Sequence, residues 1–141
     1  MLALLLFACD TTFTSTSQSC EVDLIAVEPA EVQPGDTVTL TATPLTESWD
    51  TAIRVGGVDA EVLTVGREGC DDCDVCQAEQ GCVGCKDDCD ACDATCETCV
   101  ETATFTVPAL DAGDHAVLLF NANGGSNPIT LTVTESDTGA D

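Results

Sequence analysis

Cysteine is the residue type whose number and spacing in this chain point most directly to chemistry. The 141 residues include 11 cysteines, and nine of these lie between Cys70 and Cys99. The nine are Cys70, Cys73, Cys76, Cys82, Cys85, Cys89, Cys92, Cys96 and Cys99. Cysteines at this density form structural disulfides in an oxidising compartment, or bind metal ions as thiolates.

Structural disulfides are the interpretation that we favour. Nine is an odd number, so one partner must come from elsewhere, and Cys20 lies just before the first expected strand. Adding Cys20 to the nine clustered cysteines makes ten, enough for five bridges, and leaves Cys9 aside. The spacing does not determine which cysteines pair.

Metal binding is the alternative interpretation of the same residues. Repeated Cys-x2-Cys pairs let two thiolates bind one zinc or copper ion, and four thiolates complete a tetrahedral site. The candidate ligands are Cys82, Cys85, Cys89 and Cys92. Thioredoxin-like redox chemistry is a weaker third possibility, because its Cys-x2-Cys motif opens a helix after a parallel strand. Under the disulfide interpretation no cofactor is expected.

The spacing of the cysteines also predicts the elements that carry them. From Cys82 the separations alternate between three and four residues, which places all six sulfurs on one face of a helix. Cys70, Cys73 and Cys76 would share a face of a shorter helix that ends near Gln80-Gly81. We therefore expect a cysteine-rich α-helical hairpin, inserted at residues 67–101, with its two sulfur stripes facing each other. Acidic residues would occupy the outer faces: Asp71, Asp72, Asp74, Glu79, Asp87, Asp88, Asp90, Asp93 and Glu97.

On either side of this insertion, apolar residues recur with a period of two. Val38, Leu40 and Ala42 alternate with threonines, a pattern typical of a half-buried antiparallel strand. The same pattern predicts strands at 51–55, 58–65, 102–107, 115–121 and 129–133, and Gly56-Gly57 predicts a tight hairpin turn. Short strands separated by turn signals indicate an all-β fold, a β-sandwich.

Several of these segments resemble an IPT/TIG domain. They are Ile25-Ala-Val-Glu-Pro29, the run from Pro34 to Thr41, Ile53 to Ala60, Phe105-Thr-Val-Pro108, Ala112 to Val117, and Asn123-Gly-Gly-Ser-Asn127. The resemblance implies an immunoglobulin-like β-sandwich over residues 22–134, interrupted by the insertion at 67–101. It also implies a surface or secreted protein that acts as a binding or spacer module, and it brings no catalytic residues.

The first residues suggest export. Met1 to Ala8 is apolar but too short to span a membrane as a helix, and Leu6-Phe7-Ala8-Cys9 resembles a bacterial lipobox. We expect a lipoprotein-type signal segment at 1–9 with lipidation at Cys9, or else a simple cleaved signal that leaves Cys9 as an extra thiol. Residues 10–21 are rich in Thr and Ser and predict a flexible tether, and residues 135–141 predict a disordered acidic tail.

The net charge of the chain excludes two classes of binding partner. With 3 basic and 26 acidic residues the formal net charge is −23, which excludes binding to nucleic acid and to anionic lipid headgroups. His115, the single histidine, is expected at an edge or on the surface, and Trp49 as a core or edge anchor. These residues provide no catalytic set, so an enzyme is not predicted.

The sequence therefore predicts a non-catalytic lipoprotein of the bacterial cell envelope, with a structural or adhesive role. The lipid would hold it at a membrane, and the acidic hairpin would face a protein or glycan partner at the cell surface. A metal-binding envelope protein is the alternative.

Overall fold

The computed structural model describes residues 21–82 and 89–136, and β-strand is their predominant secondary structure. The strands are β1 (Asp23–Glu28), β2 (Glu31–Val32), β3 (Thr37–Thr43), β4 (Ala52–Val55), β5 (Val58–Glu68), β6 (Val100–Thr106), β7 (Gly113–Asn121), β8 (Gly124–Gly125) and β9 (Ile129–Val133). Between β5 and β6 lie helix α1 (Asp71–Gln80), the 3₁₀ turn η2 (Asp90–Cys92) and the one-turn helix α2 (Asp93–Cys96). The all-β prediction is confirmed at this level.

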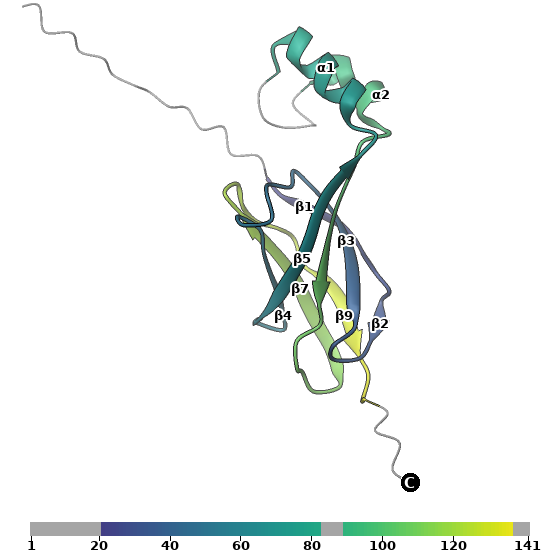
Figure 1. The fold of residues 1–141 in the computed structure, drawn as a ribbon, viewed down its shortest axis with the longest axis vertical. Helices are drawn as coiled ribbons and strands as arrows, with labels where there is room; N and C mark the ends of the chain where they lie inside the picture. The colour runs from purple at the N-terminus through teal and green to yellow at the C-terminus, as the bar shows by residue number, and fades with distance from the viewer. Residues whose placement is uncertain (1–20, 83–88, 137–141) are drawn as a thin grey trace, which may run out of the picture.

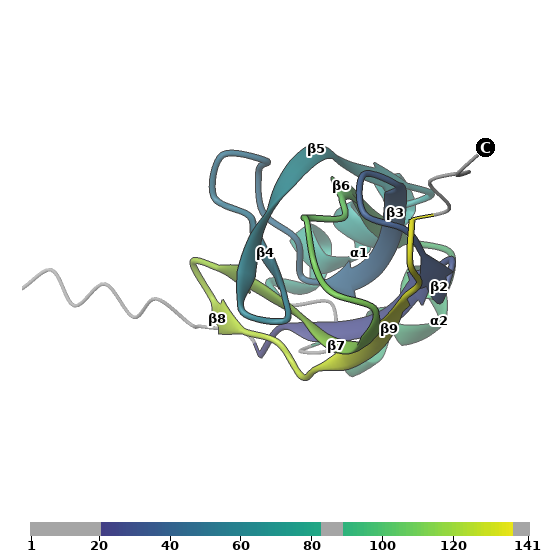
Figure 2. The same ribbon diagram turned by 90° about the horizontal axis from the view of Figure 1, so that it is seen from below.

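The strands wrap around one interior in a sandwich-like or barrel-like arrangement. They follow the order β1-β3-β6-β5-β4-β7-β9-β2, with β8 paired to β7. Every pair is antiparallel except β2 with β9. Strand β5 belongs to both sides, because residues 58–60 pair with β4 and residues 61–68 pair with β6. Figures 1 and 2 show this long strand crossing from one group of strands to the other.

The alternating pattern determines which side chains are buried. Val38, Leu40 and Ala42 of β3 are fully buried, as predicted, and the threonines between them face outward or are partly covered. Alternate residues of the other predicted strands are buried in the same way: Ile53, Val55, Ala103, Phe105, Val107, Leu131 and Val133. Together with Val22, Leu24, Val27, Val32, Val117 and Leu119 they form a single apolar core.

Hydrogen bonds from one side chain join β1 to the segment before β9. The amide of Asn127 accepts a hydrogen bond from the backbone N–H of Leu24 (2.8 Å) and donates one to its carbonyl oxygen (2.9 Å). The side-chain amide thus bonds both backbone groups of Leu24, as a residue of a neighbouring strand would do. This contact helps to close the β structure.

The predicted hairpin turn at Gly56-Gly57 is present between β4 and β5. Both glycines have positive φ values, +57° and +81°, which residues with a side chain rarely adopt. A Cβ on Gly56 would also collide with the ring of His115. His115 is half-buried, and its Nε2 lies 2.8 Å from the carbonyl oxygen of Asp111.

Two expectations differ from the structure. Trp49 is 84% exposed, so the prediction of a core or edge anchor is wrong; it sits in a turn, outside any strand that would direct it inward. Strands β5 and β6 also continue past the end of the apolar alternation, pairing Gly66 with Thr102 and Glu68 with Val100. The two strands extend beyond the core there, so neither face needs apolar residues.

Several predictions fall outside the described residues. These are the signal segment at 1–9 with Cys9, the tether at 10–20 with Cys20, Cys85, Asp87, Asp88, and the tail from 137 onward. Within the residues that are described, no helix has the length and apolar character needed to cross a bilayer.

Replacement of Phe105 by Ala tests the core. Phe105 is completely buried, and Phe→Ala changes at such sites lower the free energy of unfolding by about 3–5 kcal/mol. Leu63→Ala is the control, because Leu63 is 45% exposed and its loss should change stability by less than about 1 kcal/mol. Urea unfolding followed by circular dichroism measures both. Equal destabilisation by the two changes would contradict the assigned core.

Candidate functional site

The segment between β5 and β6 projects from one end of the β structure (Figure 1). We call residues 70–99 the cysteine arm and the remaining described residues the β body. The two ends of the arm lie side by side, because Glu68 of β5 pairs with Val100 of β6. The arm therefore extends from a two-stranded ribbon and is attached at both ends.

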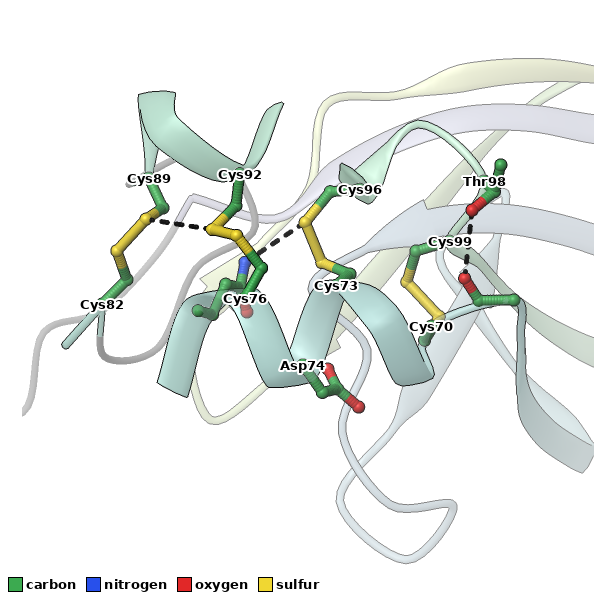
Figure 3. Close-up of a disulfide and its surroundings, with 12 residues drawn as sticks. Cys70, Cys73, Asp74, Cys76, Cys82, Cys89, Cys92, Cys96, Thr98 and Cys99 are labelled. Carbon is green, nitrogen blue, oxygen red and sulfur yellow. Dashed lines mark hydrogen bonds between the residues drawn. A yellow bond between two sulfur atoms is a disulfide. The ribbon is translucent and has the colours of Figure 1, made fainter. Parts of the chain in front are cut away.

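Four disulfides connect the two halves of the arm. They join Cys70 to Cys99, Cys73 to Cys96, Cys76 to Cys92, and Cys82 to Cys89, with Cα–Cα distances between 4.2 and 5.9 Å. Each successive pair is nested inside the previous one, so the bridges form a ladder (Figure 3). Disulfide bonding, which the sequence left open as to pairing, is confirmed for these eight cysteines.

The first half of the arm folds as the spacing predicts. Cys73 and Cys76 lie on one face of α1, and Cys70 occupies the position just before its first residue. Asp71, Asp72 and Asp74 lie in the first turn, where negative charge interacts favourably with the helix dipole. Gly81, at a φ of +70°, ends the helix, and the N–H of Cys82 bonds to the carbonyl of Gln77.

The second half is not the continuous helix that we expected. Among its described residues it is helical only from Asp90 to Cys96, as the 3₁₀ turn η2 followed by the single turn α2, and Cys89 has a non-helical backbone. This segment is rich in Asp, Thr and Cys, which are poor helix formers. Its path is therefore determined by the disulfides that hold Cys92, Cys96 and Cys99 opposite the first half of the arm. The sulfurs face each other although this half does not form one continuous helix.

An arginine joins the arm to the β body. Arg67 on β5 donates two hydrogen bonds to the carboxylate of Asp74 on α1, both 3.0 Å long. Its Nε donates a third, of 3.0 Å, to Glu101 on β6, whose side chain is only 8% exposed. The pKa of Arg67 is raised above its ordinary value, and the hydrogen bonds with Asp74 are the largest cause. Burial is the next largest effect and lowers the pKa, and the negative charges of Glu101 and Asp74 then raise it further.

A second contact lies at the root of the arm. The hydroxyl of Thr98 donates a hydrogen bond of 3.3 Å to the carbonyl of Gly69. Gly69 has a φ of +66°, and a Cβ there would collide with the carbonyl oxygen of Thr98. With Arg67, this contact fixes where the arm leaves the ribbon.

The outer surface of the arm is acidic. Asp71, Asp72, Glu79, Asp90, Asp93 and Glu97 are exposed. Asp74, also on the arm, forms an ion pair with Arg67. The described part of the arm contains no basic residue, so it presents a surface of uniform negative charge.

A cleft runs beside the root of the arm. It has a volume of about 610 Å³ and lies between the 44–47 loop and the Val65–Arg67 segment, with Glu101 also in its lining. A smaller cavity of about 50 Å³ continues beneath α1 and is lined in part by Thr43, Cys73 and Gln77. The hydroxyls of Thr43 and Thr46 are buried and make no hydrogen bond within the described residues.

The candidate metal ligands are only partly brought together. Cys82, Cys89 and Cys92 lie close to one another in the ladder, and Cys85 is outside the described residues. All three are bonded to other sulfurs, and a disulfide sulfur is not the thiolate that zinc or copper requires. No cluster of three or more His, Cys, Asp or Glu side chains in residues 21–82 and 89–136 is arranged to hold a metal ion.

Sequence reasoning missed Arg67 and Glu101. The available signal was that Arg67 is one of only three basic residues and lies just before the first clustered cysteine.

No family model matches this chain, and no curated protein matches its sequence.

Replacing Arg67 tests the junction. Arg67→Ala leaves the buried carboxylate of Glu101 without its cation, which should lower the free energy of unfolding by about 1–3 kcal/mol. Arg54→Ala is the matched control, since it removes the same charge from a largely exposed pair with Asp59 and should change stability by about 1 kcal/mol or less. Chemical denaturation of the oxidised proteins checks this; a larger loss in the Arg54 variant would refute it.

Reduction tests the independence of the two parts. All four described disulfides lie in the arm, and the core of the β body contains no cysteine. Complete reduction should therefore make the arm sensitive to a Glu- and Asp-specific protease while the β-type circular dichroism persists. Loss of the β signal together with the arm would show that the β body needs the disulfides.

Proposed function

We propose that this protein is a non-catalytic, exported module of the bacterial cell envelope that presents the cysteine arm to a binding partner. The observation that carries the proposal is the disulfide ladder, which holds an acidic surface in one conformation at one end of a β body. A surface that is already ordered loses little conformational entropy on binding. A rigid arm of this kind suits recognition better than it suits a spacer.

The number of disulfides supports a location outside the cytosol. Bridges persist in oxidising compartments such as the periplasm and the cell surface, whereas cytosolic thiols are kept reduced. With the lipobox-like segment at residues 6–9, this supports lipidation at Cys9 and attachment to a membrane. In this proposal the tether at 10–21 places the β body at a distance from the bilayer.

The β body is proposed to be immunoglobulin-like, of the IPT/TIG type. The support is the motif resemblance together with the antiparallel strands, the apolar core between them and the strand β5 that serves both sides. The arm then takes the place of a strand-connecting loop, and it retains the path of a hairpin even though its second half is helical only in part. Loops at the end of a β-sandwich often carry its binding residues.

The acidic surface defines the class of partner. A negatively charged arm attracts a cationic protein segment, or a glycan that carries basic groups, and repels anionic ones. We therefore propose a basic protein, or a glycan with free amino groups, at the cell surface as the partner.

Metabolic labelling tests the anchor. In a bacterium that produces the full chain, an alkyne-tagged fatty acid should label the protein, and Cys9→Ser should abolish the label. The same preparation should show an unreduced mass at least eight hydrogens below the reduced mass, two for each of the four described bridges. An unlabelled protein with alkylatable thiols and bound zinc would instead favour the metal-binding alternative.

Charge neutralisation tests the binding surface. We expect purified oxidised protein to be retained on intact cells of the producing bacterium, and replacement of Asp71, Asp72, Asp90 and Asp93 by Asn to remove most of that retention. The control replaces four exposed acids of the β body, Glu28, Glu31, Glu61 and Asp111, by their amides, which gives the same change in net charge. Equal loss in both variants would show that only overall charge matters, and no loss in the arm variant would refute the proposal.

A further inference from the structure

Two neighbouring bridges of the ladder are in contact at its distal end, the end away from the β body. The Sγ atoms of Cys89 and Cys92, which belong to different disulfides, lie 3.6 Å apart (dashed in Figure 3). Neither sulfur carries a hydrogen while both bridges are formed, so this is a van der Waals contact. Both side chains are buried, with 5% and 0% of their surface exposed.

We propose that the distal end of the arm is a thiol–disulfide exchange site, whose substrates are external thiols. The Cys82–Cys89 bridge is the one that an external thiol opens, and Cys92 is the sulfur to which the exchange passes. This inference concerns a reactivity of the arm and does not rest on the binding function proposed above.

The exchange proceeds in two balanced steps. An external thiolate attacks Sγ of Cys82, forms a mixed disulfide with it, and releases Cys89 as a thiolate. The Cys89 thiolate then attacks Sγ of Cys92, which forms a Cys89–Cys92 bond and breaks the Cys76–Cys92 bond. Cys76 leaves as a thiolate and takes a proton from water, so the number of disulfide bonds is unchanged.

The geometry favours the second step. Reacting atoms held about 3–3.5 Å apart are close to the distance of attack, and the two sulfurs already lie near this range. Figure 3 shows the sulfur of Cys92 bonded to that of Cys76 and facing that of Cys89, so the attacked atom already carries its leaving group. The thiolate would therefore need little movement.

The product also fits the backbone. The N–H of Cys92 bonds to the carbonyl of Cys89 over 2.8 Å, which makes these residues the ends of a tight turn. The Cα atoms at the ends of such a turn lie within about 7 Å, and disulfides accept separations of about 4.4–6.8 Å. A Cys89–Cys92 bridge can therefore form without unfolding the turn.

The exposure of the sulfurs determines where an external thiol enters. Cys70, Cys73, Cys96 and Cys99 of the two proximal bridges are buried, whereas Cys76 and Cys82 of the two distal bridges are half-buried. Cys82 follows the end of α1 and closes the smallest loop of the ladder, with a sequence separation of 7. An external thiol therefore reaches the two distal bridges before the proximal ones, and we place its entry at Cys82, in the bridge at the tip.

The variant Cys82→Ser tests the second step by itself, because it supplies Cys89 as a free thiol without any reductant. We expect rapid alkylation after acid quenching to label Cys76, and peptide mapping to find a Cys89–Cys92 bond. Label on Cys89 equal to or greater than label on Cys76, with the Cys76–Cys92 bond intact, would overturn the proposal.

The matched control is Cys99→Ser, which frees Cys70 at the other end of the ladder. The Sγ of Cys70 lies 3.4 Å from the carbonyl oxygen of Glu68, a group that cannot take part in exchange. Label is therefore expected to stay on Cys70. Rearrangement to the same extent in this variant would show that exchange is a general property of the ladder, which contradicts a distal site.

Partial reduction of the unmodified protein gives a second test that needs no substitution. A phosphine at about pH 3, where thiols are protonated and do not exchange, should reduce the Cys82–Cys89 bridge first, so that an alkylating reagent then labels Cys82 and Cys89. A brief shift to about pH 8 before alkylation should move the second label from Cys89 to Cys76 and leave the label on Cys82 unchanged. A labelling pattern that is the same at both pH values would overturn the proposal.

Discussion

The described part of the arm buries almost nothing except sulfur. Its internal cluster consists of Cys70, Cys73, Cys89, Cys92, Cys96 and Cys99, with Cys76 and Cys82 packed against them. A side chain as small as cysteine removes little apolar surface from water, and isolated helices shorter than about 12–15 residues are marginal in water. The ten residues of α1 and the shorter η2 and α2 are therefore held by covalent bonds. The acidic surface, the junction at Arg67 and the sulfur contact at the tip all depend on those bonds.

The β body could be predicted largely from its sequence, because its signal is periodic and redundant. Val38, Leu40 and Phe105 sit in segments where each apolar residue is flanked by threonines, so burial follows from a period of two. Trp49 had no such context: a single aromatic residue beside a turn has no period, and size alone does not indicate burial. The glycine pair at 56–57 was informative because only positive φ angles close a two-residue hairpin of this type.

The arm could be predicted in composition but not in connectivity. Separations of three and four residues are compatible with many pairings and with a helix in either half, so the alternatives have similar sequence support. What distinguishes them is the junction, where Arg67 meets Glu101 across paired strands, 34 residues apart in sequence. That pair depends on the register of β5 and β6, which the non-alternating residues near the arm do not reveal. The same register brings Cys70 and Cys99 together and so determines the first bridge of the ladder.

The nesting of the bridges divides their contributions unequally. The sequence separations fall from 29 to 23, 16 and 7 toward the tip. A single cross-link over the largest of these loops would lower the entropy of the unfolded chain, which raises the free energy of unfolding by about 3–4 kcal/mol. In the ladder each bridge closes only the few residues beyond its neighbour, so any one bridge adds less than that while the others remain. Redundancy of this kind allows the distal bridges to rearrange without releasing the rest, because the proximal bridges and Arg67 still hold α1 against the β body. Rigidity at the base of the arm and reactivity at its tip are therefore compatible within one short segment.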